Sequence, residues 1–367
     1  MKSSDVRSLF PVLKNSAFLN NAAESPLNVK SHKALLEYLE FASNAPQDKP
    51  SPRPVVRAAL SDLFGGETED YALVTSTGVG VGIAAAGYDW KEGDNVVVPI
   101  DEHWNSTFPW LALQDRGIEV RLVPTDQYQR ILTEDIAARV DDNTRVVATT
   151  AVRFTTGFRA DLGAIGKIAK SKNALFVVDG IQAAGVTPLN VIEDGIDVLA
   201  CGGFKWLLGM PGTGFMYVNK TAREKIRPVL PGMFAAKHKM RELDYHDDAR
   251  RYETGSIAYS LFHAWAAGLG ILKEVGVEII HAKILVLTNQ IISGLQTKGI
   301  EIISPVEQVT ERSAIVSFTL GSAEANKKLH QKLADHNIIV ALRAGSIRVS
   351  PNFFNSGQDI ERLISLL

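Results

Sequence analysis

Cysteine is almost missing from this sequence: the only one in the chain is Cys201. A single cysteine cannot form a disulfide bond within its own chain, so a disulfide framework is excluded. Thiols that stay reduced are typical of a reducing compartment, and we expect a cytoplasmic protein. A signal peptide is missing as well, because MKSSDVRSLFPVLKN has no apolar core, and no window of the chain is apolar enough to cross a bilayer. We therefore expect no membrane partner.

An excess of charge of one sign is also missing. Lys and Arg together number 39 and Asp and Glu together 41, which gives a formal net charge of −2. This balance provides no electrostatic attraction toward nucleic acid. We therefore expect no nucleic-acid partner.

Motifs for the common metal and nucleotide sites do not occur in the chain. There is no H-E-x-x-H motif and no cluster of Cys and His, and the run DYHDD at 244–248 is most simply a solvated rim. The glycine-rich run TSTGVGVG at 75–82 lacks the Lys-Ser/Thr pair of a P-loop. The sequence therefore predicts no metal site and no nucleotide site.

The chain does contain many short runs of apolar residues. Its 367 residues are 46% hydrophobic, which is enough for one large domain and a smaller one. Helical stretches separate several of seven strand-like runs, which are YALVTS, NVVVPI, EVRLVP, RVVATTAV, ALFVVDG, DVLACGG and GFMYVN. We predict an α/β fold in which residues 17–255 form a large domain with a mostly parallel seven-stranded sheet between helices. Residues 256–367 are predicted to form a smaller α+β domain, against which residues 1–16 pack.

Two successive apolar runs end in groups that can react together. Asp179 follows FVV, and Lys205 follows DVLACGGF. Buried parallel strands would deliver both side chains to one sheet edge, where open α/β sheets bind their ligands. A lysine in an apolar, glycine-lined setting has a lowered pKa and can form a Schiff base with a carbonyl. An aspartate beside a pyridinium nitrogen completes the requirements of pyridoxal 5'-phosphate (PLP).

Gln182 supports this interpretation, because it lies three residues after Asp179 and can send its amide to the same ring. Asp179 alone would more often be a turn residue, and Lys205 alone a surface lysine. The glycine-rich run at 75–82 adds a further element, since a turn of this kind before a helix offers backbone N–H groups to a phosphate. We therefore predict that the chain binds PLP.

The segments DGIQ at 179–182 and GGFKWLLGMPGTGF at 202–215 resemble the fold type I PLP enzymes of the class V aminotransferase superfamily. The closest resemblance is to the branch of cysteine desulfurases and selenocysteine lyases. It extends from FLNNAAESPL near the N-terminus to IRVSPNFFNSGQDIERLI near the C-terminus. The resemblance implies the fold of these enzymes, PLP as the cofactor and a Schiff base between PLP and Lys205. It does not identify the reaction.

The resemblance also implies roles around the cofactor. Thr77 and Gly78 match the phosphate-binding turn of the superfamily. Trp104 matches the position of the ring that stacks on the cofactor, and His103 beside it is an alternative, since either ring would stack. Ser256, in RRYETGSIA, matches a hydroxyl residue that reaches the phosphate of a partner subunit, which implies a homodimer with composite sites. Read alone, Ser256 would be a helix N-cap.

Substrate contacts are implied in the same way. Arg348 matches the arginine that binds the carboxylate of an amino-acid substrate, and Arg343 is the rival for that role. Asn21 and Ala22 match the strand that closes over the substrate carboxylate.

One difference from the desulfurases restricts the reactions that we expect of this chain. Desulfurases of this branch carry a cysteine on a mobile loop, whereas Cys201 is expected inside the sheet with a raised pKa. We therefore expect a PLP-dependent lyase or transferase acting on an amino acid, with cleavage of a C–S bond at Cβ as the favoured reaction. The alternatives are an aminotransferase, an amino-acid epimerase or other chemistry at Cα, and a non-catalytic interaction module.

Overall fold

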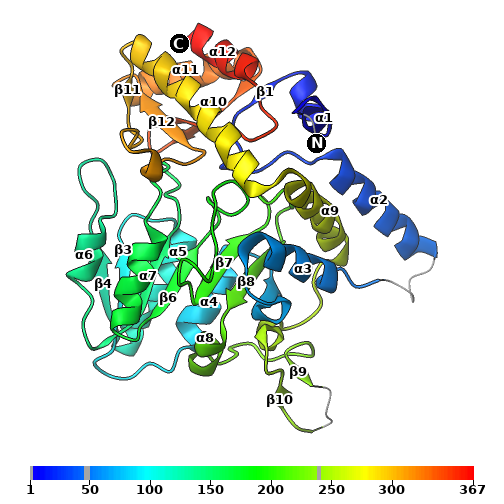
Figure 1. Ribbon diagram of the computed structural model, residues 1–367, viewed down its shortest axis with the longest axis vertical. Coiled ribbons are helices and arrows are strands. Elements are labelled where there is room, and N and C mark those ends of the chain that lie inside the picture. Colours follow the sequence, from blue (N-terminus) through cyan, green and yellow to red (C-terminus); the bar gives the residue numbers. More distant parts are fainter. Residues whose placement is uncertain (1–2, 45–49, 238–240) are drawn as a thin grey trace.

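A seven-stranded sheet runs through the larger part of the molecule in this computed structural model, which describes residues 3–44, 50–237 and 241–367 (Figure 1). The strand order is β2-β8-β7-β6-β5-β3-β4, and only β8 runs antiparallel to its neighbours. The strands are β2 (Tyr71–Val74), β3 (Asn95–Pro99), β4 (Glu119–Val123), β5 (Thr144–Thr150), β6 (Leu175–Asp179), β7 (Val198–Gly202) and β8 (Gly214–Val218). Each coincides with one of the seven predicted runs, except that β5 begins one residue earlier, and the predicted α/β fold is confirmed.

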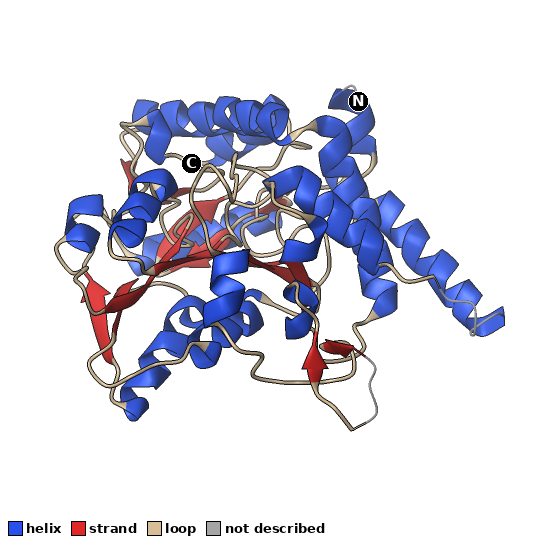
Figure 2. Ribbon diagram, turned by 60° about the horizontal axis from the view of Figure 1, so that its bottom comes forward, coloured by secondary structure: helices blue, strands red, loops and turns tan. Residues whose placement is uncertain are grey.

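Helices cover both faces of this sheet (Figure 2). Successive side chains of a strand point to opposite faces, so Val177 and Val178 of β6 belong to two separate hydrophobic cores. One face packs against α3 (Arg53–Phe64), α7 (Leu162–Ser171) and α9 (Tyr259–Val275). The other packs against α4 (Thr77–Gly87), α5 (Trp104–Leu111) and α8 (Lys220–Lys225). Short α6 (Thr133–Ala137) packs beside α7, and α2 (Val29–Asn44) packs along α9.

A smaller antiparallel sheet lies above the large one in Figure 1 and has its own core. Its order is β11-β12-β15-β14, with β11 (Glu301–Ile302), β12 (Val316–Thr319), β14 (Ala341–Arg343) and β15 (Ser346–Val349). Its helices are α10 (Val277–Thr297), α11 (Ala323–Asp335) and α12 (Gly357–Leu366). The N-terminal chain, with α1 (Ser3–Ser8), joins this part, because β1 (Ala17–Phe18) pairs in parallel with β13 (Ile338–Ile339).

The packing of α9 bears on the domain boundaries. Phe262, Trp265 and Leu269 of this helix belong to the core of the large sheet, although a boundary at 256 would assign them to the small domain. We therefore propose a boundary near Gly276, between α9 and α10, and include β1 in the small domain. Within the described residues, no single helix is long and apolar enough to span a membrane; only α9 and α10 taken together, bent by 79°, meet that test.

A buried carboxylate fixes the segment that precedes α9. Glu253 accepts hydrogen bonds from the backbone N–H of Leu73 (2.8 Å), from Nε of Arg53 (3.1 Å) and from Arg57. Glu253 and Arg53 are both buried, so each charge depends on the other for compensation. This network ties the chain before Ser256 to α3 and β2.

Replacing Glu253 by alanine is expected to lower the free energy of unfolding by about 3–5 kcal/mol, because Arg53 stays buried without its partner charge. Urea unfolding followed by circular dichroism measures the loss. The control is Glu274→Ala, which removes an exposed pair with Lys30 and should cost less than about 1 kcal/mol. Equal unfolding midpoints for the two variants would contradict the role of Glu253.

Candidate active site

The fold brings Asp179 and Lys205 to the same edge of the large sheet. Asp179 is the last residue of β6, and Lys205 lies three residues beyond the end of β7, which pairs with β6 in parallel. Asp179 is 5% exposed and Lys205 8% exposed. The two charges interact, since Asp179 raises the pKa of Lys205 and Lys205 lowers that of Asp179. The pair therefore forms one buried acid–amine site.

Two donors hold the carboxylate of Asp179. The hydroxyl of Ser106 donates to Oδ2, and the backbone N–H of Ile181 donates to Oδ1 at 2.9 Å. Burial raises the pKa of Asp179, while these hydrogen bonds and the charges of Lys205 and His103 act in the opposite direction. Ser106 was not predicted as a site residue, because its contact arises from the placement of α5 over β6 and leaves no local sequence signal.

The amine of Lys205 is suited to nucleophilic chemistry. Burial lowers its pKa to about 8, and the nearby charges of Arg348 and Arg343 act in the same direction. Lys205 forms no ion pair with any residue that the structure describes, and its Nζ lies 5.6 Å from the centre of the Phe204 ring. A substantial fraction of the amine is therefore neutral near physiological pH, as the sequence predicts.

Gln182 connects two loops at the site. Its Oε1 accepts from the indole N–H of Trp206 (2.9 Å), and its Nε2 donates to the carbonyl of Ala22 (3.1 Å). The backbone N–H of Ser25 donates to the carbonyl of Phe204 at 3.0 Å. These bonds hold the 22–25 segment over the Lys205 loop. The predicted contact of Gln182 with the cofactor stays a prediction.

The predicted phosphate site is the start of α4. Ser76 caps this helix by accepting from the N–H of Val79 at 3.2 Å, and Thr77 accepts from the N–H of Gly202 at 2.9 Å. A methyl group at Gly78 would lie only 3.1 Å from the side chain of Asn105 at the start of α5. The turn is therefore bonded to the end of β7 and packed against a second helix start. Ser76 and Asn105 were not predicted as site residues.

The two candidate rings occupy different positions. His103 is half-buried before α5 and accepts from the N–H of Asn105 (3.2 Å); burial and the charge of Lys205 lower its pKa. Trp104 is 67% exposed, and its ring lies 5.7 Å from that of His103. The structure thus brings His103 close to the acid–amine pair and leaves the face of Trp104 accessible. The choice between the two rings stays a prediction.

Arg348 lies on β15, at the junction of the two sheets. Its Nη1 donates to the carbonyl of Phe154 (2.6 Å), while its buried Nε has no hydrogen-bond partner. Burial and the charge of Arg343 lower the pKa of Arg348 to about 10. Arg343 is exposed on the neighbouring strand β14. Arg348 therefore offers an unused donor beside Lys205, as a carboxylate clamp requires.

Asn21 and Ala22 are bound to the end of β15. Asn21 donates to the carbonyl of Ser350 (2.9 Å), and the N–H of Ala22 donates to the hydroxyl of Ser350 (3.0 Å). Both residues therefore have a structural role, and their closure over a substrate stays a prediction.

Ser256 and Cys201 lie at opposite extremes of exposure. Ser256 is exposed and lies two residues before Ala258, which is the N-cap of α9, so the interpretation of Ser256 as a helix cap is wrong. Cys201 lies inside β7, is 1% exposed and has a pKa well above its ordinary value because of burial. The predicted burial of this thiol is confirmed.

A comparison with family models decides the classification: the model for aminotransferase class V matches residues 54–361. The chain belongs to the class V aminotransferase family. The predicted family, the predicted class of enzyme and its cofactor, PLP, are thereby confirmed at the level of the family.

Similar proteins cover nearly the whole length of this chain. A probable cysteine desulfurase from Methanothermobacter thermautotrophicus is 25% identical, with 99% of this chain and 96% of the relative covered. An uncharacterized aminotransferase from Bacillus subtilis is also 25% identical, with coverage of 98% and 95%. The two relatives are named for different reactions, although both are 25% identical to this chain.

Solved structures share the fold. The cysteine desulfurase from Thermococcus onnurineus has a TM-score of 0.90 at 22% identity, with 99% of this chain and 96% of that chain covered. The cystine C–S lyase C-DES, in complex with cysteine persulfide, has a TM-score of 0.89 at 23% identity, with coverage of 97% and 98%. At these sequence identities, the similarity to both structures supports the fold of this chain.

The described residues fit PLP. Lys205 supplies an amine without an ion-pair partner, Asp179 a buried carboxylate with fixed geometry, and the start of α4 free backbone donors. The unpaired Nε of Arg348 adds a buried donor for the carboxylate of an amino acid.

In cofactor-free protein, Lys205 is expected to be reductively methylated with a midpoint near pH 8, because its neutral amine predominates above its pKa of about 8. Peptide mass spectrometry over a pH series measures the midpoint. Asp179→Asn should lower it further, since the charge of Asp179 raises the pKa of Lys205. Lys172 is an exposed control whose pKa is raised by Asp142. A shared midpoint for Lys205 and Lys172 would contradict the effect of burial.

Proposed function

We propose that this protein is a PLP-dependent lyase that breaks the bond between Cβ and sulfur in a free amino acid. The observation that carries the proposal is the Asp179–Lys205 pair together with the burial of Cys201. A desulfurase that takes sulfur onto its own cysteine needs an accessible thiolate, and Cys201 is the only cysteine in the chain. Sulfur would therefore leave with the product. The names of the cysteine desulfurase and cystine C–S lyase relatives support this reaction class.

The residues of the chain divide the work of such a reaction. When bound, PLP supplies an electron-withdrawing ring that stabilises negative charge at Cα of the substrate. Asp179 would hold a proton on the ring nitrogen, fixed by Ser106 and the N–H of Ile181. Arg348 would bind the α-carboxylate and set the orientation of the Cα–H bond.

Lys205 would move the proton. Its pKa of about 8 lets the neutral amine accept the proton from Cα and return it later. The electron pair of the Cα–H bond then expels sulfur from Cβ as a thiolate, or as a persulfide from a disulfide substrate. Water releases the remaining carbon skeleton as pyruvate and ammonia. The overall change for cysteine is hydrolysis to pyruvate, ammonia and sulfide, without an external oxidant or reductant.

Transamination is the second candidate. The relative from Bacillus subtilis that carries an aminotransferase name is as similar to this chain as the desulfurase from Methanothermobacter thermautotrophicus. In that reaction Lys205 would take the proton from Cα, and no group would leave from Cβ. Epimerisation would need the proton back on Cα, on the opposite face.

Incubation with L-cysteine and L-cystine is expected to yield pyruvate and ammonia in equal amounts, with sulfide or persulfide. Lys205→Ala should reduce kcat by about 10²–10⁴-fold, because the group that transfers the Cα proton is lost. Lys172→Ala, at an exposed position, is the matched control. A new amino acid formed in step with an added keto acid, without pyruvate or sulfide, would favour the aminotransferase.

We also propose a cytoplasmic homodimer in which Ser256 of one protomer donates to the cofactor phosphate of its partner. The exposure of Ser256 and the anchoring of its segment by Glu253 support this role. Leu230, Met233 and Leu243, in the chain that precedes it, are each more than half exposed and would be available to a subunit contact.

Ser256→Ala is expected to weaken PLP binding by about 10–100-fold, because one hydrogen bond to a charged group is worth about 1.5–3 kcal/mol. Equilibrium titration of cofactor-free protein with PLP measures the change. Ser365→Ala, on the outer face of α12, should leave the affinity unchanged. Tight binding by a protein that sedimentation shows to be monomeric would disprove the cross-subunit contact.

A further inference from the structure

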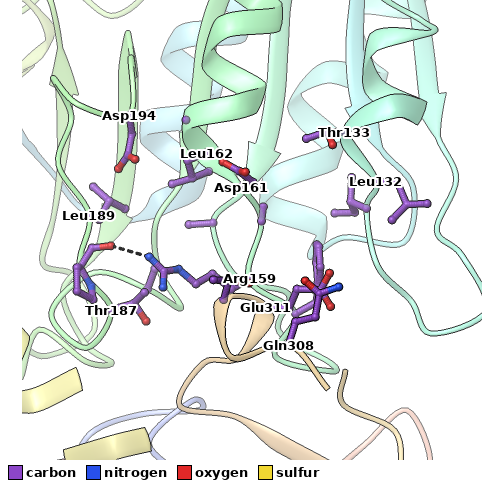
Figure 3. A pocket seen from close by; sticks show the side chains of 18 of the residues that line it. Leu132, Thr133, Arg159, Asp161, Leu162, Thr187, Leu189, Asp194, Gln308 and Glu311 are labelled. Atoms are coloured by element: carbon purple, nitrogen blue, oxygen red, sulfur yellow. Dashed lines mark hydrogen bonds between the residues drawn. The ribbon is translucent and has the colours of Figure 1, made fainter. Parts of the chain in front are cut away.

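A cavity of about 490 Å³ opens beside the start of α7, and neither Asp179 nor Lys205 is among the residues that line it (Figure 3). Its walls come mainly from four segments: residues 131–134 at the start of α6, residues 158–163 at the start of α7, residues 187–189 after β6, and residues 308–311 of the smaller domain. None of the residues that line it is among those assigned above to the cofactor or the substrate. It nevertheless adjoins the active site, since Ala183 in its wall follows Gln182.

Arg159 brings a guanidinium to the wall of this cavity. It is half-buried, and its single side-chain hydrogen bond is a long one of 3.4 Å to the carbonyl of Pro188 (Figure 3). It forms no ion pair with any residue in the described part of the chain. Burial lowers its pKa, against the charges of Asp194 and Asp161. Most of its donors therefore stay available to an anionic group.

Thr187 contributes a second donor. Its side chain lines the cavity and is 2% exposed, and its hydroxyl has no hydrogen-bond partner. An unpaired buried hydroxyl is unfavourable, so a ligand atom that completes its hydrogen bonding gains free energy. Arg159 contacts Pro188, the residue after Thr187, and both Arg159 and Thr187 line the cavity. The guanidinium and the hydroxyl together offer the donors that a carboxylate accepts from.

Acidic side chains line this cavity as well, and they are Glu134, Asp161, Asp194 and Glu311. Asp194 accepts from the N–H of Asn190 (3.0 Å) through Oδ2, and Asp161 accepts from the N–H of Ala164 (2.9 Å) through Oδ1. Among the residues that the structure describes, none donates to Oδ1 of Asp194 or to Oδ2 of Asp161. Asp194 is half-buried, and burial raises its pKa, so a nearby cation would stabilise its charged form.

Apolar side chains complete the wall. Phe158, Leu162 and Leu189 are buried and line the same cavity. A ligand for this cavity thus needs a carboxylate, an ammonium group and an apolar side chain.

We propose that this cavity binds a free apolar α-amino acid as a zwitterion. Its carboxylate is bound by Arg159 and Thr187, its ammonium group by Asp194, and its side chain lies against Leu162 and Leu189. The site is separate from the proposed reaction, because none of these residues takes part in cofactor binding.

L-leucine is the probe, titrated by calorimetry into PLP-loaded protein that has been reduced with borohydride, so that the cofactor cannot condense with the amine. We expect saturable binding at one site per chain. 4-Methylpentanoate lacks the ammonium group and 3-methylbutylamine lacks the carboxylate, so both should bind at least about tenfold more weakly. Cofactor-free protein should give the same affinity for L-leucine, so the outcome does not depend on the proposed reaction.

Variants locate the binding site. Arg159→Gln is expected to weaken L-leucine binding by about 10–100-fold and Thr187→Val by a smaller factor, while Arg159→Lys keeps part of the affinity. Arg116→Gln, at an exposed arginine outside the cavity, is the matched control and should bind normally. Thermal unfolding verifies that each variant is folded. No saturable binding up to about 10 mM, or equal affinity in Arg159→Gln and Arg116→Gln, would overturn the proposal.

Discussion

The carboxylate of Asp179 and the amine of Lys205 share the carboxyl edge of the large sheet, where burial disfavours both of their charges. Each group partly compensates the other, and the hydroxyl of Ser106 and the N–H of Ile181 add fixed donors on the acid. This balance sets the pKa of Lys205 at about 8, so that the neutral amine is accessible near physiological pH. The arrangement depends on β6 and β7 being parallel neighbours, because only then do both strands end on the same side.

Hydrogen bonds between loops keep this edge in place. Thr77 links the start of α4 to the end of β7, and Gln182 links the Trp206 indole to the backbone of Ala22. Asn21, through Ser350, continues the connection into the smaller sheet. The N-terminal chain therefore joins two parts of the molecule at the place where the acid–amine pair lies, although it contributes no strand to the large sheet.

The local sequence pattern was enough to predict some of these structural features, but not others. The seven strands and the positions of Asp179 and Lys205 could be predicted, because short buried strands and the glycines that end them are written in consecutive residues. Ser106 and Asn105 could not, since their contacts depend on how α5 packs across the sheet. The sequence also did not indicate which domain α9 packs with, because its apolar face would suit the core of either domain. The Arg159 cavity combines four segments of the chain, and none of them alone carries a sequence signal for it.

The burial of the single thiol has a practical consequence for spectroscopy. Cys201 is enclosed in β7 with a strongly raised pKa, so thiol-directed reagents find no reactive partner on the folded wild-type surface. The natural sequence therefore serves as a background for site-directed labelling without prior removal of cysteines. A fluorophore or spin label attached to one cysteine introduced on α11 and another on α8 would report the separation of the two sheets during turnover.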